Sequence, residues 1–321
     1  MPVTLQGPGA TAFTSTEDKT YWVRRMLIRA TPKLFYNQFA AKDYIPKNNG
    51  MNVEWRREST IAASTTALVE GSYPAETVPT VVTVSASVAQ YGQYVRSTDV
   101  VQAQAIDDIR AETSDNLGEA MGNSYDQLTR AIYNAGTTVQ YALTAGSRVQ
   151  VGSGFRMTSA ELREAVATLE TNNAQPFEDG GFKAIIHPRV KADLLNDTNF
   201  LNAQQYAGVR GNDNTLFSGK LGRYYGVDFY VTSNAQIGTS LGYSGADVYY
   251  STIVGKDYIG VVDLTALTAE QIYHPLGSGG ATGDPLSQVW SIGYKFAHAA
   301  ARLNESFAVR VETTSSLGTL G

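Results

Sequence analysis

The sequence of 321 residues predicts an α+β fold, with one long helix beside a strand-rich C-terminal part. Residues 114–134 carry apolar side chains at three- and four-residue spacing, which is typical of a helix with one buried face. Residues 51–56 and 80–88 alternate apolar and polar side chains, as strands do. Three short stretches near the C-terminus, at 289–295, 299–303 and 307–312, also predict strands.

Composition narrows the class of protein. Charged residues make up 17% of the chain, against about 25% in ordinary soluble domains. This low fraction indicates either a surface covered by partners or a surface of neutral Ser, Thr and Gly. The net charge of −5 argues against a dedicated nucleic-acid binder, which normally has a basic face. The absence of cysteine excludes disulfides and thiolate metal sites.

The N-terminus lacks the basic start and apolar block of a secretory signal, and no apolar run reaches 18 residues. We therefore expect neither export nor a membrane helix. Residues 1–18 contain Gly7, Pro8 and Gly9 and are expected to form a flexible arm. A helix is expected over 19–29.

Residues 49–95 predict a long two-stranded excursion. Asn49-Gly50 signals a turn, and the alternating stretches 51–56 and 80–88 enclose a polar segment that contains Gly71 and Pro74. An isolated hairpin is at best marginally stable in water, and this one has no cysteine to staple it. It must therefore lie on another surface, either in its own chain or in a neighbouring subunit.

The helical region follows. Ser97 or Thr98 can cap a short helix at Asp99, and the long helix over 114–134 would span about 30 Å. Gly136 is expected to end this helix in the left-handed conformation. The apolar stripe of this spine helix comprises Leu117, Met121, Tyr125, Leu128 and Ile132. The face expected opposite to it comprises Glu119, Asn123, Asp126 and Arg130.

A mixed domain is expected between the spine helix and the last strands. Thr158 to Glu161 form a capping box that opens a helix, and Pro188 starts another. Strands are expected over 182–186, 227–231, 248–254 and 258–264, with exposed or flexible loops over 205–222 and 275–285.

The chain shows no pattern of catalytic chemistry. His187, His274 and His298 each lack a second ligand at helical spacing, and Asp107-Asp108 is expected to be a solvated pair. Gly219-Lys220 is followed by leucine, so a phosphate-binding loop is not formed, and no nucleophile elbow is present. We therefore expect no enzyme activity, no cofactor and no metal.

An ordered series of motifs resembles the major capsid proteins of tailed bacteriophages, in the branch of the N-four-like phages. The motifs are Glu54–Arg57, Leu68–Pro74, Ala89–Val95, Thr98–Val101 and Asp126–Thr137. Residues 221–234 and 285–295 agree more loosely. The resemblance implies the Hong Kong 97 fold, with an N-terminal arm (1–48), an extended loop (49–95), a peripheral domain (96–157 and 285–321) and an axial domain (158–284).

The resemblance also implies a function. Subunits would form pentamers and hexamers that close into an icosahedral shell around double-stranded DNA, assembled in the host cytoplasm and located in the virion. The extended loop would lie over the adjacent subunit. Expected partners are a separate scaffolding protein, a portal and decoration proteins, without a membrane. The expected contact residues are Glu54, Trp55, Arg56, Arg57, Glu58, Glu70, Gly71 and Tyr73.

Three other classes of protein compete with this one. An encapsulin-like shell would share the fold and enclose a cargo enzyme. A bacterial surface protein would suit the Thr, Gly and Tyr content, but no signal sequence supports it. An enzyme has the least support from the residues.

Overall fold

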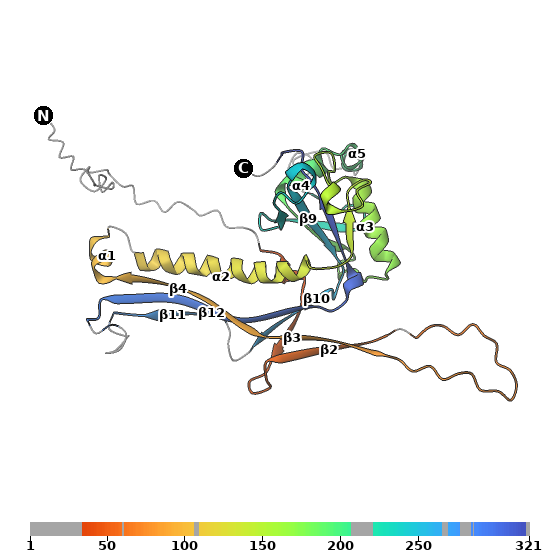
Figure 1. The fold of residues 1–321 in the computed structure, drawn as a ribbon, viewed down its shortest axis with the longest axis horizontal. Helices are drawn as coiled ribbons and strands as arrows, with labels where there is room; N and C mark the ends of the chain where they lie inside the picture. Colours follow the sequence, from red (N-terminus) through yellow and green to blue (C-terminus); the bar gives the residue numbers. More distant parts are fainter. Residues whose placement is uncertain are drawn as a thin grey trace.

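The computed structural model describes residues 34–59, 61–105, 109–206, 221–264, 269–276, 284 and 286–318. It confirms a mixed α and β architecture with a long helix, two larger sheets and a projecting hairpin (Figure 1). The expected arm over 1–18, the expected helix over 19–29, Asp107-Asp108 and most of the loops 205–222 and 275–285 lie outside the described residues.

The spine helix, α2 (Ile109–Tyr133), lies along the first larger sheet. The central strand of this sheet is β12 (Val289–Arg302). Its first part pairs with β4 (Ala89–Thr98) on one side and β11 (Glu270–His274) on the other, both antiparallel. Its last part pairs with β10 (Ile259–Leu264), which in turn pairs in parallel with β1 (Ala41–Ile45).

Apolar side chains from β12 meet the apolar stripe of α2. Trp290, Ile292, Tyr294 and Phe296 alternate along β12 and are buried, so the strand period of two places them all on the helix side. Leu117 is buried among them. This contact forms the core between helix and sheet.

The second larger sheet is the core of a compact lobe at one end of α2 (Figure 1). Its strand order is β5 (Val139–Tyr141), β13 (Ala308–Thr313), β9 (Val248–Val254), β6 (Phe182–Ile186) and β7 (Val227–Val231), and β8 (Ile237–Gly238) pairs with β9. The helices of the lobe are α3 (Ser159–Thr171), α4 (Pro188–Leu195) and α5 (Thr198–Tyr206).

The structure confirms the sequence signals for the starts of α3 and α4. Thr158 and Glu161 form the reciprocal capping box at α3, and Pro188 occupies the first turn of α4. All five residues of β6 are buried, as expected for the short strand over 182–186, and they include Lys183, whose charge is paired as described below.

Short elements complete the fold. The helix α1 (Asp99–Gln104) follows β4, with Thr98 as its N-cap but without a side-chain capping bond. The described residues also form the 3-10 turns η1 (Tyr36–Phe39), η2 (Arg148–Gln150), η3 (Tyr243–Gly245) and η4 (Glu305–Phe307).

Three sequence-based expectations were wrong. The strands expected over 289–295 and 299–303 are one continuous strand, because β12 serves two sets of neighbours along its length. The spine helix starts at Ile109 rather than at 114. Gly136 does not have a positive φ; it lacks a side chain because a Cβ there would lie 2.7 Å from the Tyr258 hydroxyl. Asp126 lies on the face expected opposite to the apolar stripe, but it is buried there.

Asp126 instead joins three parts of the molecule. It is 1% exposed, and its carboxylate accepts the backbone N–H of Tyr36 at 3.0 Å and the side-chain amide of Asn234 at 2.7 Å. Arg130 donates to the backbone and side-chain oxygens of Asn234. This polar joint ties the segment before β1 and the turn after β7 to the spine helix.

Candidate assembly interface

The projecting hairpin consists of β2 (Asn52–Glu58) and β3 (Val81–Ser87), in the register Trp55 opposite Val84. Regular pairing ends where Ser59 N–H donates to the Thr80 carbonyl. Beyond this point two extended legs run away from the body of the molecule (Figure 1). They meet in a turn that is closed by the Ser72 N–H donating to the Val69 carbonyl. Gly71 has φ +79° there, a value that a side chain would strain.

The root of the hairpin is anchored on its own chain. The Trp55 indole N–H donates to the Asp43 carboxylate at 2.6 Å, and a Cβ at position 260 would lie 2.8 Å from the indole ring. Val53 and Ala86 pack on the same side, against a buried cluster that contains Val262. Trp55, which we expected to attract a neighbouring subunit, therefore has a half-buried place within its own chain.

The other hairpin residues singled out from the sequence face solvent in the single chain. Glu54 and Arg56 point to the same side of β2 and form an exposed ion pair at 3.5 Å. Arg57 and Glu58 are also exposed. At the far end, Glu70 and Gly71 form the terminal turn, and Tyr73 beside it is 97% exposed.

Sequence reasoning did not select several apolar side chains of the hairpin. Ile61, Leu68, Val69 and Val78 are all more than half exposed, and Leu68 reaches 76%. They are irregularly spaced, so neither the helical nor the strand period marks them. Large apolar side chains gathered on one projecting segment are a signature of a contact surface rather than of ordinary exposure.

The spine-helix residues lie between the helix and its neighbours. Met121 and Leu128 pack on the cluster formed by β12, and Tyr125 packs on both that cluster and the one at the lobe. Ile132 packs at the lobe end, where Tyr36, Tyr133 and Tyr258 are buried. The stripe therefore supports the platform from which the hairpin projects.

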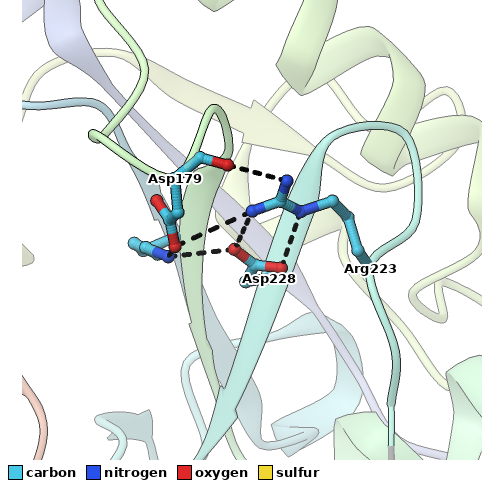
Figure 2. Close-up of polar contacts among 4 residues, drawn as sticks. Asp179, Arg223 and Asp228 are labelled. Carbon is cyan, nitrogen blue, oxygen red and sulfur yellow. Dashed lines mark hydrogen bonds and ion pairs between the residues drawn. The ribbon is translucent and has the colours of Figure 1, made fainter.

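The densest group of charges among the described residues lies in the lobe (Figure 2). The Arg223 guanidinium donates to both oxygens of Asp228, at 2.9 and 2.7 Å, and also to the Asp179 carbonyl. Lys183, almost fully buried, donates to Asp179 and, at 2.9 Å, to Asp228. The Arg223 hydrogen bonds lower the pKa of Asp228 to about 2. Each charge has an opposite partner, so the group ties the ends of β6 and β7 together.

One histidine has a neighbourhood that superficially resembles a catalytic triad. His298 Nε2 lies 3.3 Å from the Thr129 hydroxyl, and its Nδ1 lies 3.9 Å from an Asp263 oxygen. Thr129 is fully buried and donates its hydroxyl to the Tyr125 carbonyl, so no substrate can reach it. The described residues contain no group of three or more side chains suited to a metal ion. None of the helices in the described part is long and apolar enough to span a bilayer.

Comparison with known proteins shows which family the chain belongs to. The model of the family described as phage capsid protein matches residues 80–311, which is more than two thirds of the chain. The chain belongs to the phage capsid protein family. Comparison with curated proteins found no match.

Solved capsid structures share the fold of this capsid protein. The chain superposes on the capsid of cyanophage Pam1 with a TM-score of 0.74 at 14% identity, covering 97% of this chain and 100% of that one. The capsid of cyanophage P-SCSP1u gives 0.70 at 16% identity, covering 96% of both chains. The capsid of Ralstonia phage GP4 gives 0.70 at 14% identity, covering 96% and 98%. At such identities the likeness establishes the fold, which is the Hong Kong 97 type.

Family and fold together identify a tailed-phage major capsid protein, a structural component of the virion. The match begins at Thr80, in the returning half of the hairpin, and ends within β13. It therefore includes the spine helix, the long strand β12 and the sheet of the lobe.

Proposed function

We propose that this capsid protein forms pentamers and hexamers that close into an icosahedral shell around double-stranded phage DNA. The observation that carries the proposal is the projecting hairpin, whose far half has exposed apolar side chains and no support from the described part of its own chain. A two-stranded ribbon of this kind is at best marginally stable alone in water. Cover by an adjacent subunit removes these side chains from water.

The fold suggests which part of the subunit makes which contact in the shell. We assign the lobe to contacts around the five- and six-fold axes, and the spine helix with the β12 sheet to contacts between neighbouring rings. Of the axial domain expected over 158–284, β10 and β11 pair with β12, so we count them with the peripheral sheet. The extended loop is the hairpin of β2, β3 and the legs. Because β4 pairs with β12 over its whole length, we place residues 89–95 with the peripheral sheet rather than with the loop.

The hairpin contact would depend on apolar burial more than on charge. Exposed ion pairs such as Glu54 with Arg56 contribute about 0–1 kcal/mol each. A fully buried side chain of the size of Leu68 contributes about 1.5–3 kcal/mol. We therefore expect Leu68, Val69 and Tyr73 to provide the attraction and the charges of β2 to set the register.

The protein acts passively in this proposal, without catalysis or cofactor. A separate scaffolding protein, a portal and decoration proteins are the partners that such a shell needs, and assembly takes place in the host cytoplasm. The DNA would be enclosed without sequence-specific contacts, in keeping with the net charge of −5.

Electron microscopy tests the proposal. The full-length chain, expressed with the other head proteins of its phage, should yield closed shells or rings of five and six in negative stain, with matching sizes by light scattering. A matched variant replaces residues 61–79 by two glycines, which leaves the paired strands β2 and β3 intact. It should unfold at the same temperature as the natural chain but form no shells. Natural chain that stays monomeric with all head proteins present contradicts the proposal.

A further inference from the structure

The turn between β1 and β2 contains the one Asn-Gly pair of the sequence, Asn49-Gly50. The turn spans residues 46–49 and is closed by the Asn49 N–H, which donates to the Pro46 carbonyl at 3.3 Å. Asn48 and Gly50, on either side of Asn49, have φ values of +71° and +85°. Asparagine and glycine adopt this left-handed conformation more readily than other residues. The turn expected from this pair is therefore present, and residues 46–50 are all exposed.

An asparagine that is followed by glycine can react with its own main chain. A bond between the side-chain carbonyl carbon of Asn49 and the main-chain nitrogen of Gly50 closes a five-membered ring. A side chain at position 50 would crowd this ring, and glycine has none. Folded proteins suppress such a reaction where the main-chain N–H is hydrogen-bonded or where the asparagine is held by partners and shielded from water.

None of these protections applies to Asn49-Gly50 within the described part of the chain. The Gly50 N–H donates no hydrogen bond there, and the Asn49 side chain has no polar partner. A Cβ at position 50 would meet nothing within 4 Å apart from its chain neighbours, so the space around this residue is open. Water, which the second step of the reaction consumes, can reach both exposed residues.

The corresponding pair in the lobe is protected. Asp179-Gly180 is the one Asp-Gly pair of the sequence and could form the same ring. The Gly180 N–H donates to the Phe177 carbonyl at 2.8 Å, and the Asp179 carboxylate accepts from the buried Lys183. Its nitrogen and its carboxylate are therefore both engaged, unlike those groups of Asn49-Gly50.

Asparagines in the spine helix are protected in a different way. Asn123 lies inside α2, where the helical hydrogen bonds hold the main-chain N–H of the next residue. Its side chain also accepts a hydrogen bond from Gln127 at 3.2 Å. Asn123 therefore provides an internal reference for a slow site in the same molecule.

We propose that Asn49-Gly50 is a site of self-modification, at which Asn49 is converted to aspartate and isoaspartate and loosens the root of the hairpin. The Gly50 nitrogen gives up its proton to water or hydroxide and attacks the Asn49 side-chain carbonyl carbon. A C–N bond forms, the bond to the amide NH2 group breaks, and ammonia leaves. Water then opens the cyclic imide. Opening at the side-chain carbonyl gives aspartate, and opening at the main-chain carbonyl gives isoaspartate.

The position of the turn gives the reaction a structural effect. β1 is fixed in its sheet by β10, and Trp55 of β2 donates to Asp43 of β1 at 2.6 Å. Both products add a negative charge to the turn, and isoaspartate also lengthens the main chain by one carbon atom. A longer linkage between two strands that are joined by the Trp55 hydrogen bond shifts β2 relative to β1. The hairpin root should therefore loosen as the protein ages.

Mass spectrometry of the aged full-length chain tests the chemistry. Trypsin cleaves after Lys47 and Arg56 and releases residues 48–56, which contain Asn49 together with two other asparagines as internal references. Purified protein is incubated at pH 6 and at pH 8, and unincubated protein shows what the digestion itself causes. Isoaspartate is detected by methyl transfer from a protein-isoaspartate methyltransferase. The matched variant Asn49→Gln keeps the amide but would have to close a larger ring.

We expect Asn49 to lose its amide roughly tenfold or more faster than Asn123, and faster at pH 8 than at pH 6 because the attacking nitrogen must lose a proton. Isoaspartate should appear in residues 48–56 of the natural chain and not in those of Asn49→Gln. An Asn49 that stays intact, or that reacts no faster than Asn123, overturns the inference. The reaction takes place in the single subunit, so either result leaves the proposed shell function untouched.

Hydrogen exchange measures the effect on the hairpin. Aged natural chain and Asn49→Gln incubated for the same time are compared, since only the natural chain should carry isoaspartate. Exchange in β2 and β3 should be faster in the aged natural chain, with exchange in β6 unchanged. Equal exchange in both proteins, once the natural chain has been converted, contradicts the loosening of the hairpin root.

Discussion

Replacement of Asp126 by alanine tests whether the polar joint holds the capsid protein together. The carboxylate accepts hydrogen bonds from the Tyr36 backbone and the Asn234 side chain, and both donors would be left without their acceptor. Hydrogen bonds to a charged group contribute about 1.5–3 kcal/mol each. Burial raises the pKa of Asp126, so removal of the carboxylate also relieves a desolvation cost that offsets part of this loss.

The net loss in the free energy of unfolding should therefore be about 3 kcal/mol. For a chain of this size each kcal/mol shifts the melting temperature by roughly 2–4 °C, so Asp126→Ala should melt roughly 6–12 °C lower. Circular dichroism of the purified subunit during heating measures the shift. Glu119→Ala, on the exposed side of the same helix, should stay within about 0.5 kcal/mol of the natural chain. Equal melting temperatures for the two variants would refute the reasoning that the joint is a main support.

Three further predictions concern separate sites. Because Arg223 lowers the pKa of Asp228 from 3.8 to about 2, this carboxylate stabilises the fold above pH 3.8 and loses that effect as the pH falls towards 2. The variant Asp228→Asn should be less stable at pH 7. Urea titrations should show that its free energy of unfolding falls less steeply than that of the natural chain between pH 3.8 and 2. Burial, aided by Arg189, lowers the pKa of His187 from 6.5 to about 4, so its contribution to stability is complete above pH 6.5 and declines towards pH 4. His187→Asn keeps a capping acceptor for α4 and should abolish that decline, whereas an unchanged pH profile would contradict the assignment. Trp55→Ala removes the indole that holds the hairpin root to Asp43, and hydrogen exchange in β2 and β3 should accelerate at least tenfold while exchange in β6 is unchanged.

The candidate interface was only partly predictable. The alternation around Trp55 and Val84 predicted the hairpin, and the turn with Gly71 lies at its far end. The contact role of Trp55, which the resemblance implies, stays a prediction, because the period of a strand reveals which residues share a face but not what covers that face. The exposure of Leu68 and Val69 was not predictable either, since the same letters occur in buried segments elsewhere.

That β4 pairs with β12 alone among the described strands could not be found from the sequence. Its residues pair with β12 about 200 positions later, and the choice of a partner at that distance depends on the whole topology. An open edge is defined by the strand that is missing beside it, which no local pattern records.

The sequence by itself determined the elements whose signals are local. The capping box at Thr158, the proline at the start of α4 and the apolar spacing of the spine helix each act within one or two turns of chain, so the residues themselves dictate the structure. The tertiary structure decided the rest. It made Asp126, on the face opposite the apolar stripe, part of a buried joint, and it joined two expected strands into β12, because burial and strand pairing depend on partners that are distant in sequence.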